Sequence, residues 1–153
     1  MRIVQIWFGK MPKKNKVFVD KIKKYCKEHG FEYNIITGKS YGSVDLNRIA
    51  SNMLRLEVMK TCKDTLYLDC DIEIKYIQNL KKDKPSFGRF NKDISDAIMY
   101  SGDTTWFRDV LEPKKTVWGL FKVINLKRLR QDRKVDIIPD EYYEHKMYSL
   151  KSK

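Results

Sequence analysis

The sequence has no long apolar run and no regular arrangement of cysteines. None of its 153 residues lies in a stretch approaching the ~18 consecutive apolar residues of a membrane span. The apolar run at residues 3–8 is too short for the core of a signal peptide. The three cysteines, Cys26, Cys62 and Cys70, are odd in number and widely spaced. They form neither a disulfide framework nor a zinc knuckle, and they favour a reducing, cytoplasmic location.

Internal repeats and low-complexity linkers are also absent from the sequence. A length of 153 residues predicts one domain, covering residues 1–153. A chain of this size can bury roughly 70% of its unfolded surface, so a real core is possible. Hydrophobic residues make up 42% of the sequence and aromatic residues 12%, which is typical of a globular protein and excludes a disordered one.

Acidic residues are outnumbered by basic ones, and the formal net charge is +12. A field of this sign attracts nucleotide phosphates, nucleic acid or an acidic membrane surface. A lysine-rich, solvated surface with no partner explains the charge equally well. The basic residues gather in segments 10–27 and 127–134. Neither segment has the interleaved aromatic residues of a platform for single-stranded nucleic acid.

The first half of the chain alternates between strand and helix patterns. Apolar runs at residues 2–8, 31–36 and 65–69 predict strands. Between them, residues 15–29 and 45–62 predict amphipathic helices. Asn15 and Asp45 are the expected N-caps, and Gly30 ends the first helix. This β-α-β-α-β order predicts an α/β fold with a parallel sheet and helices on its faces.

The second half is less regular. Residues 72–74, 86–90, 94–100 and 135–138 predict short strands. Residues 103–111 predict a short helix that Pro113 ends. Residues 116–129 predict a longer helix, which Gly119 weakens.

Two carboxylates follow the third predicted strand. Asp69 and Asp71 are spaced i, i+2 directly after the apolar residues 66–68. Ligands of open α/β sheets bind at the carboxyl ends of the strands. One or two carboxylates with substrate phosphates suffice for Mg²⁺. The alternation with Ile72 and Ile74 also predicts that Glu73 points with the two aspartates. A divalent cation held against a phosphorylated ligand is therefore expected here, with a simple charged turn as the alternative.

The helix before this strand carries a second polar pattern. Arg48, Ser51, Asn52 and Arg55 are spaced i, i+3, i+4 and i+7, so they share one face of the helix, opposite its apolar row. An arginine directed at the end of the sheet can bind a diphosphate through two parallel hydrogen bonds. Seen alone, the same face would be interpreted as solvated.

Together these motifs resemble a known family. Residues 3–9 (IVQIWFG) resemble the first strand of the glycosyltransferases that share the sugar-binding region with a DXD motif, namely family 32 and the related glucosylating toxins. Residues 50–55 (ASNMLR) and 66–71 (LYLDCD) are similar to the family's Ser-Asp-x-x-Arg helix and Tyr-x-Asp-x-Asp strand. Segments 96–101 and 135–143 are similar to later landmarks, so the resemblance covers most of the chain. It implies a Rossmann-like GT-A fold, a UDP- or GDP-hexose donor, and Mn²⁺ or Mg²⁺.

The resemblance also implies roles for single residues. Trp7 would lie against the nucleobase, and Tyr67 would help to position it. Arg55 would contact the donor sugar and diphosphate. Asp69 would face the ribose or sugar and a metal-bound water, while Asp71 would ligate the metal directly. Such enzymes retain the anomeric configuration, and no catalytic nucleophile is assigned. The implied donor-binding residues are Ile6, Trp7, Ser51, Asn52, Arg55, Tyr67 and Asp69, and the implied metal ligands are Asp69, Asp71 and His145.

The sequence departs from the family pattern in several places. Asn52 replaces an aspartate, and an amide accepts hydrogen bonds less strongly than a carboxylate. Residues 62–64 replace the usual Gly-Gly before the strand. His145 and Ser149 have the spacing of a C-terminal His or Ser-Trp element, but Leu150 replaces its Trp. The chain is short for the family, so parts of the acceptor pocket are either missing or supplied by a second subunit of a homo-oligomer. The acceptor stays open: a glycan, a lipid-linked sugar, a protein or modified nucleic acid.

Other functions fit parts of the sequence. The segment Glu73-Ile74-Lys75 matches the Glu-x-Lys of metal-dependent nucleases, although such enzymes place their other Asp on the preceding strand and Asp69 lies on the same one. The net charge by itself fits a non-catalytic nucleic-acid-binding protein. Phosphatases of the haloacid dehalogenase type place Asp-x-Asp near the N-terminus with a Thr shortly after, and both features are missing here.

Overall fold

A central sheet with helices packed on it organises the molecule, seen in a computed structural model that describes residues 1–77 and 80–145. The elements, in chain order, are β1 (Arg2–Phe8), α1 (Lys13–His29), β2 (Glu32–Gly38), α2 (Val44–Thr61), β3 (Thr65–Leu68), β4 (Ile72–Ile74), β5 (Ser86–Phe90), β6 (Asp93–Tyr100), α3 (Thr105–Val110), β7 (Glu112–Thr116), β8 (Gly119–Val123), α4 (Leu126–Leu129), β9 (Asp136–Ile137), a 3-10 turn η1 (Asp140–Tyr142) and β10 (Tyr143–His145).

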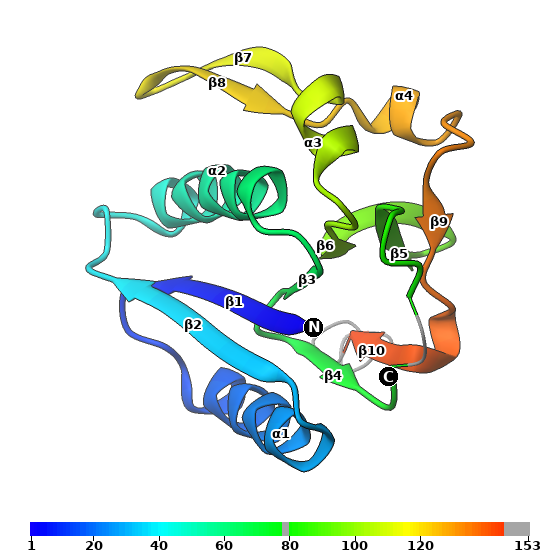
Figure 1. The fold of residues 1–153 in the computed structure, drawn as a ribbon. Coiled ribbons are helices and arrows are strands. Elements are labelled where there is room, and N and C mark those ends of the chain that lie inside the picture. Colours follow the sequence, from blue (N-terminus) through cyan, green and yellow to red (C-terminus); the bar gives the residue numbers. More distant parts are fainter. Residues whose placement is uncertain (78–79, 146–153) are drawn as a thin grey trace.

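Six strands form the main sheet, in the order β2-β1-β3-β6-β5-β9. Strand β1 runs parallel to β2 and β3, and β5 runs parallel to β9. Strand β6 is antiparallel to both of its neighbours. Helix α1 covers one face of the sheet, while α2 and α3 lie on the other (Figure 1). The expected fold class, a mostly parallel α/β sheet with helices on both faces, is confirmed.

Successive strand residues point to opposite faces of the sheet and so build two cores. Ile3 and Leu66 face α1, where they pack with Ile22. Val4 and Tyr67 point the other way and pack with residues of α2 and α3, including Met59 and Phe107. Because both faces are covered, β1 and β3 read as continuous apolar runs in the sequence.

The predicted elements of the first half are confirmed, with two corrections to their caps. Helix α1 begins at Lys13 after Pro12, so Asn15 lies inside the first turn instead of capping it. Its side-chain amide donates to the backbone oxygen of Cys70, 3.3 Å away. Helix α2 is capped by Ser43, whose hydroxyl accepts from the backbone N–H of Leu46 at 3.1 Å, and not by Asp45. Gly30 ends α1 in a left-handed conformation, as expected.

The helix expected at residues 116–129 is wrong. This segment holds the turn and second strand of the β7–β8 hairpin and only the short α4. Thr116 pairs with Gly119, whose φ of +107° suits the turn of a hairpin and not the interior of a helix. The hairpin packs against α2, a long-range contact that local spacing does not reveal. The short strands predicted at residues 72–74, 86–90, 94–100 and 135–138 form, as does α3, whereas β10 was not predicted.

The described residues 1–77 and 80–145 include no helix that is both long and apolar enough to cross a lipid bilayer.

Candidate active site

The connections of the sheet place a cleft at the ends of β1 and β3. Helix α1 leads from β1 to β2 on one face, and α2 leads from β2 back past β1 to β3 on the other face. The direction of winding therefore reverses between β1 and β3, which is where open α/β sheets bind ligands. A cleft of about 950 Å³ opens there. Its volume lies within the range of about 300–1,000 Å³ that is usual for small-molecule sites.

The structure brings together nearly all of the residues that the sequence predicted for the site. Those lining the cleft are Ile6, Trp7, Ser51, Asn52, Arg55, Tyr67, Asp69 and Asp71. The polar face of α2 is directed into the cleft as expected, and Arg48 lines it as well. His145 is the predicted ligand that does not line the cleft.

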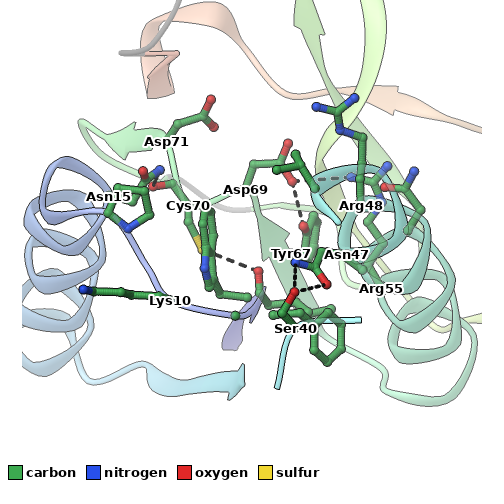
Figure 2. A pocket seen from close by; sticks show the side chains of 18 of the residues that line it. Lys10, Asn15, Ser40, Asn47, Arg48, Arg55, Tyr67, Asp69, Cys70 and Asp71 are labelled. Carbon is green, nitrogen blue, oxygen red and sulfur yellow. Dashed lines mark hydrogen bonds and ion pairs between the residues drawn. The ribbon is translucent and has the colours of Figure 1, made fainter. Parts of the chain in front are cut away.

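The turn Asp69-Cys70-Asp71 is fixed to β1 from below. The side-chain amide of Gln5 donates to the backbone oxygen of Asp69 at 3.3 Å, and the Cys70 thiol lies 3.6 Å from the backbone oxygen of Ile6. Burial raises the pKa of Cys70 to about 12, so this thiol is neutral and serves packing. Figure 2 shows Asp69 and Asp71 extending to one side of the turn, opposite Cys70. Both carboxylates are thus presented to the cleft.

Arg55 is the buried cation on the floor of the cleft. Its Nη1 lies 3.4 Å from Oδ1 of Asp69 (Figure 2). Its Nη2 lies 2.6 Å from Oδ2 of Asp96. The guanidinium also stacks 5.5 Å from the ring centre of Tyr67. Burial opposes the positive charge, but Tyr67, Asp96 and Asp69 outweigh it and raise the pKa of Arg55. Arg55 therefore stays charged and holds both carboxylates in place.

Asp69 is the most strongly perturbed acid of the site. Burial raises its pKa from 3.8 to about 6, against the opposing effects of Arg55 and of the Tyr67 hydroxyl, which donates to Oδ1 at 2.6 Å. The negative charges of Asp71 and Asp96 raise it further. About a third of the side chain remains open to the cleft, at 36% exposure, so a ligand can still reach the carboxylate.

Two carboxylates of the site fit a divalent cation. Oδ1 of Asp71 is buried, and no hydrogen-bond partner for it exists among the residues described. A buried carboxylate oxygen normally has a partner, so this atom is available to a cation or another hydrogen-bonding ligand. Within residues 1–77 and 80–145, no group of three or more Asp, Glu, His or Cys side chains forms a complete metal site. The cation would need further oxygens from a ligand, as Mg²⁺ bound to substrate phosphates does.

Glu73 and His145 do not lie where the sequence analysis expected them, because neither lines the cleft. Glu73 does not point with the aspartates, because the chain leaves the sheet after β3, and β4 pairs with β10 instead. Glu73 forms an ion pair with Lys21 of α1 at 3.4 Å. His145 lies on β10 opposite Ile72, where burial lowers its pKa and the charge of Asp71 opposes this shift. It is thus near Asp71 but outside the cleft. Ser149 and Leu150 lie outside the described residues.

Sequence reasoning missed two residues of the site. Asp96 on β6 lines the cleft and binds Arg55, although 41 residues separate the two. Gln5 is fully buried within the apolar β1, accepts the hydroxyl of Tyr33 at 2.9 Å and holds the Asp69 backbone. The signal for Asp96 was that its segment, residues 96–101, is similar to a family landmark. The signal for Gln5 was a glutamine inside a mostly apolar strand.

Comparison with known proteins supports the fold. No protein-family model matches the sequence, and no curated protein matches it either. Among solved structures, a glycosyltransferase involved in the glycosylation of the major capsid of PBCV-1 is similar with a TM-score of 0.54 and 12% identity, over 95% of this chain and 92% of that one. The chain shares the fold of this enzyme. The galactosyltransferase LgtC, solved in complex with donor and acceptor sugar analogs, has a TM-score of 0.45 and 11% identity, over 71% of this chain and 60% of that one.

Proposed function

We propose that this glycosyltransferase-fold protein transfers a hexose from a UDP- or GDP-sugar to an acceptor, with Mn²⁺ or Mg²⁺ as cofactor and with retention of configuration. The observation that carries the proposal is the convergence of Trp7, Arg55, Asp69 and Asp71 in one cleft at the switch point of the sheet. The similarity of the whole fold to a glycosyltransferase supports it.

The proposed donor lies along the cleft from β1 to α2. Trp7, half-buried on its wall, offers an aromatic surface to the nucleobase. Lys10, Lys14 and Arg48 line the same cleft and provide positive charge for a diphosphate. Ser51 and Asn52 on α2 can exchange hydrogen bonds with sugar hydroxyls, since both are donors and acceptors.

Asp69 and Asp71 would hold the cation. Bound there, a divalent metal stabilises the negative charge that develops on the departing diphosphate. The protein's own contribution is positional: Arg55 and Tyr67 hold Oδ1 of Asp69, which fixes the direction of its carboxylate. The ionised, buried Arg55 also favours the charged form of Asp69, which cation binding requires. The acceptor can be a glycan, a lipid-linked sugar, a protein or modified nucleic acid.

Titration with nucleotide sugars tests this function. Isothermal titration with UDP-glucose and GDP-mannose, in Mn²⁺ and again in EDTA, should show binding of one donor that depends on the metal. Asp71→Asn should abolish metal-dependent binding and donor hydrolysis. Asp109→Asn, an exposed change on α3, is the matched control and should behave as wild type.

The competing functions predict a different pattern. If neither donor binds and duplex DNA binds with a steep salt dependence, the protein is a nucleic-acid-binding protein or nuclease and the proposal fails. Retained hydrolysis in Asp71→Asn would contradict the assignment of the metal site. The position of Glu73, paired with Lys21 and outside the cleft, already separates it from the other carboxylates that a nuclease would need.

A further inference from the structure

Exposed apolar side chains gather at one end of the molecule. Among the described side chains, the large hydrophobic ones that are exposed are Val17, Tyr41, Val44, Tyr76, Val117 and Trp118. Four of them we call the hairpin patch: Val117 and Trp118 form the turn of the β7–β8 hairpin, Tyr41 lies in the loop before α2, and Val44 is the first residue of α2. The rings of Tyr41 and Trp118 are in contact, with their centres 5.2 Å apart. The hairpin itself extends along α2 (Figure 1).

Burial in the fold does not explain the two valines of the patch. Val44 is 74% exposed and Val117 is 68% exposed. Hairpin turns ordinarily carry Gly, Asn, Asp or Ser, yet Val117 and Trp118 precede Gly119 here. Contiguous exposed apolar surface indicates an interaction site, since isolated exposed residues need no explanation but clusters do.

The surroundings of the patch are basic. Lys114, Lys115 and Lys122 lie on the hairpin and Lys39 precedes Tyr41, and all four are exposed. Segments 113–123 and 37–44 contain no Asp or Glu. The first acidic residue beyond them on α2, Asp45, is within 3.9 Å of Arg48. The two segments that carry the patch are thus basic, with no acidic side chain of their own.

We propose that the hairpin patch docks on the surface of an anionic lipid bilayer. Trp and Tyr favour the membrane–water interface because their rings combine apolar faces with polar groups. Valines at the tip can enter the acyl boundary, and each nearby lysine adds attraction to anionic headgroups. A second copy of the chain fits less well, because an isologous contact would bring the lysines of both copies together.

This docking would set the orientation of the cleft. The ring of Phe8 meets that of Tyr41 edge-on, with centres 5.2 Å apart, and both Phe8 and Val44 line the cleft. The patch and the cleft are therefore adjacent. Docking does not depend on sugar transfer. If the proposed function also holds, the bilayer would present acceptors carried on lipid next to the cleft.

Vesicle sedimentation tests the docking. The wild type should sediment with vesicles that contain phosphatidylglycerol and stay in solution with phosphatidylcholine alone. Val117→Ser/Trp118→Ser should weaken binding at least about tenfold through lost apolar contact. Lys114→Glu/Lys115→Glu should weaken it as much through lost charge attraction. Val17→Ser and Lys23→Glu/Lys27→Glu, matched exposed changes on α1, should have little effect.

A second readout keeps the test independent of folding defects. Brominated lipids should quench the tryptophan fluorescence of the wild type, and Trp118→Phe should lose that quenching while keeping the fold. If Lys23→Glu/Lys27→Glu weakens vesicle binding as much as Lys114→Glu/Lys115→Glu does, the binding is a non-specific effect of the net charge and the proposal is overturned. Unchanged binding of Val117→Ser/Trp118→Ser would also overturn it. A concentration-dependent dimer that this variant abolishes, without vesicle binding, would assign the patch to a second copy instead.

Discussion

Nη2 of Arg55 donates a 2.6 Å hydrogen bond to Oδ2 of Asp96, joining α2 to β6 on the floor of the cleft. The arginine is nearly fully buried, and its Nε has no partner among the described residues. Its compensation therefore depends on the two carboxylates that also line the cleft. Because this buried cation has few partners, each of the two carboxylates contributes to both the stability of the fold and the geometry of the site.

We expect Asp96→Asn to destabilise the protein and weaken donor binding together. Removing one carboxylate leaves the charge of the buried Arg55 less compensated, which should lower the free energy of unfolding by about 1–3 kcal/mol. This cost is smaller than that of breaking a fully buried ion pair because Asp96 is 40% exposed. Urea unfolding and donor titration measure the two effects. Asp93→Asn, on the same strand and paired with Arg130 on the surface at 3.6 Å, should stay within about 0.5 kcal/mol. Equal effects of the two variants would contradict this role for Asp96.

Trp7 should determine nucleotide affinity through its ring. If the nucleobase stacks on it, Trp7→Ala should weaken UDP or GDP binding by about 1–3 kcal/mol, roughly 5- to 150-fold. Trp7→Phe keeps an aromatic face and is the matched control, so it should lose much less. Titration of the free nucleotide in Mn²⁺ measures this without any acceptor. Similar losses in both variants would show that packing of the cleft wall, and not stacking, is responsible.

The raised pKa of Asp69 predicts a pH dependence of stability without metal. Between the ordinary value of 3.8 and about 6, the folded protein binds more protons at this site than the unfolded protein does. The contribution of Asp69 is therefore favourable at low pH and is lost as the pH rises through this window. As the pH rises through this window, the free energy of unfolding of the wild type should fall by about 1 kcal/mol relative to that of Asp69→Asn, which cannot titrate at this position. This value is reduced because the Asp69 side chain is 36% exposed.

Paired urea unfolding in EDTA from about pH 3 to 7 measures this difference, since that range spans both pKa values. Asp109→Asn should follow the wild type at every pH. A constant difference between the wild type and Asp69→Asn across the range would show that the pKa of Asp69 is not raised.

Gly88→Ala should be among the most destabilising changes in the sheet. Strand β5 has a register shift between Phe87 and Gly88, and a Cβ at Gly88 would overlap Cγ2 of Ile98 and lie 2.8 Å from the hydroxyl oxygen of Tyr143. Overpacking of this kind costs about 1–3 kcal/mol. Gly30→Ala isolates backbone strain, because Gly30 has a positive φ and open space around its Cα. Thermal unfolding that finds Gly88→Ala milder than Gly30→Ala would contradict the packing argument.

Local patterns predicted the half of the fold that positions the site. Strands β1 and β3 are buried on both faces, and α2 has a polar face spaced by helical turns, so each carries its signal within a few residues. The same holds for Asp69 and Asp71, which directly follow an apolar strand. These are the features on which the predicted donor and metal residues depended.

Long-range packing decides the parts that local patterns did not predict. The β7–β8 hairpin is stabilised by its contact with α2, and a 14-residue apolar pattern read alone was compatible with a helix. The link from Arg55 to Asp96 spans 41 residues and follows from β6 pairing antiparallel with β3. Glu73 was misplaced because a two-residue alternation cannot reveal that the chain turns out of the sheet at Asp71.

The hydrogen bonds that fix the Asp69-Cys70-Asp71 turn to its neighbours affect how a ligand binds in the cleft. Gln5, Ile6 and Asn15 hold three successive points of the turn before anything binds. The backbone of the turn therefore loses little conformational freedom on binding, and little of the interaction energy is consumed in ordering it. The backbone N–H of Asp69 donates to the backbone oxygen of Ala97 at 2.8 Å, so its exchange with solvent should already be slow in the free protein.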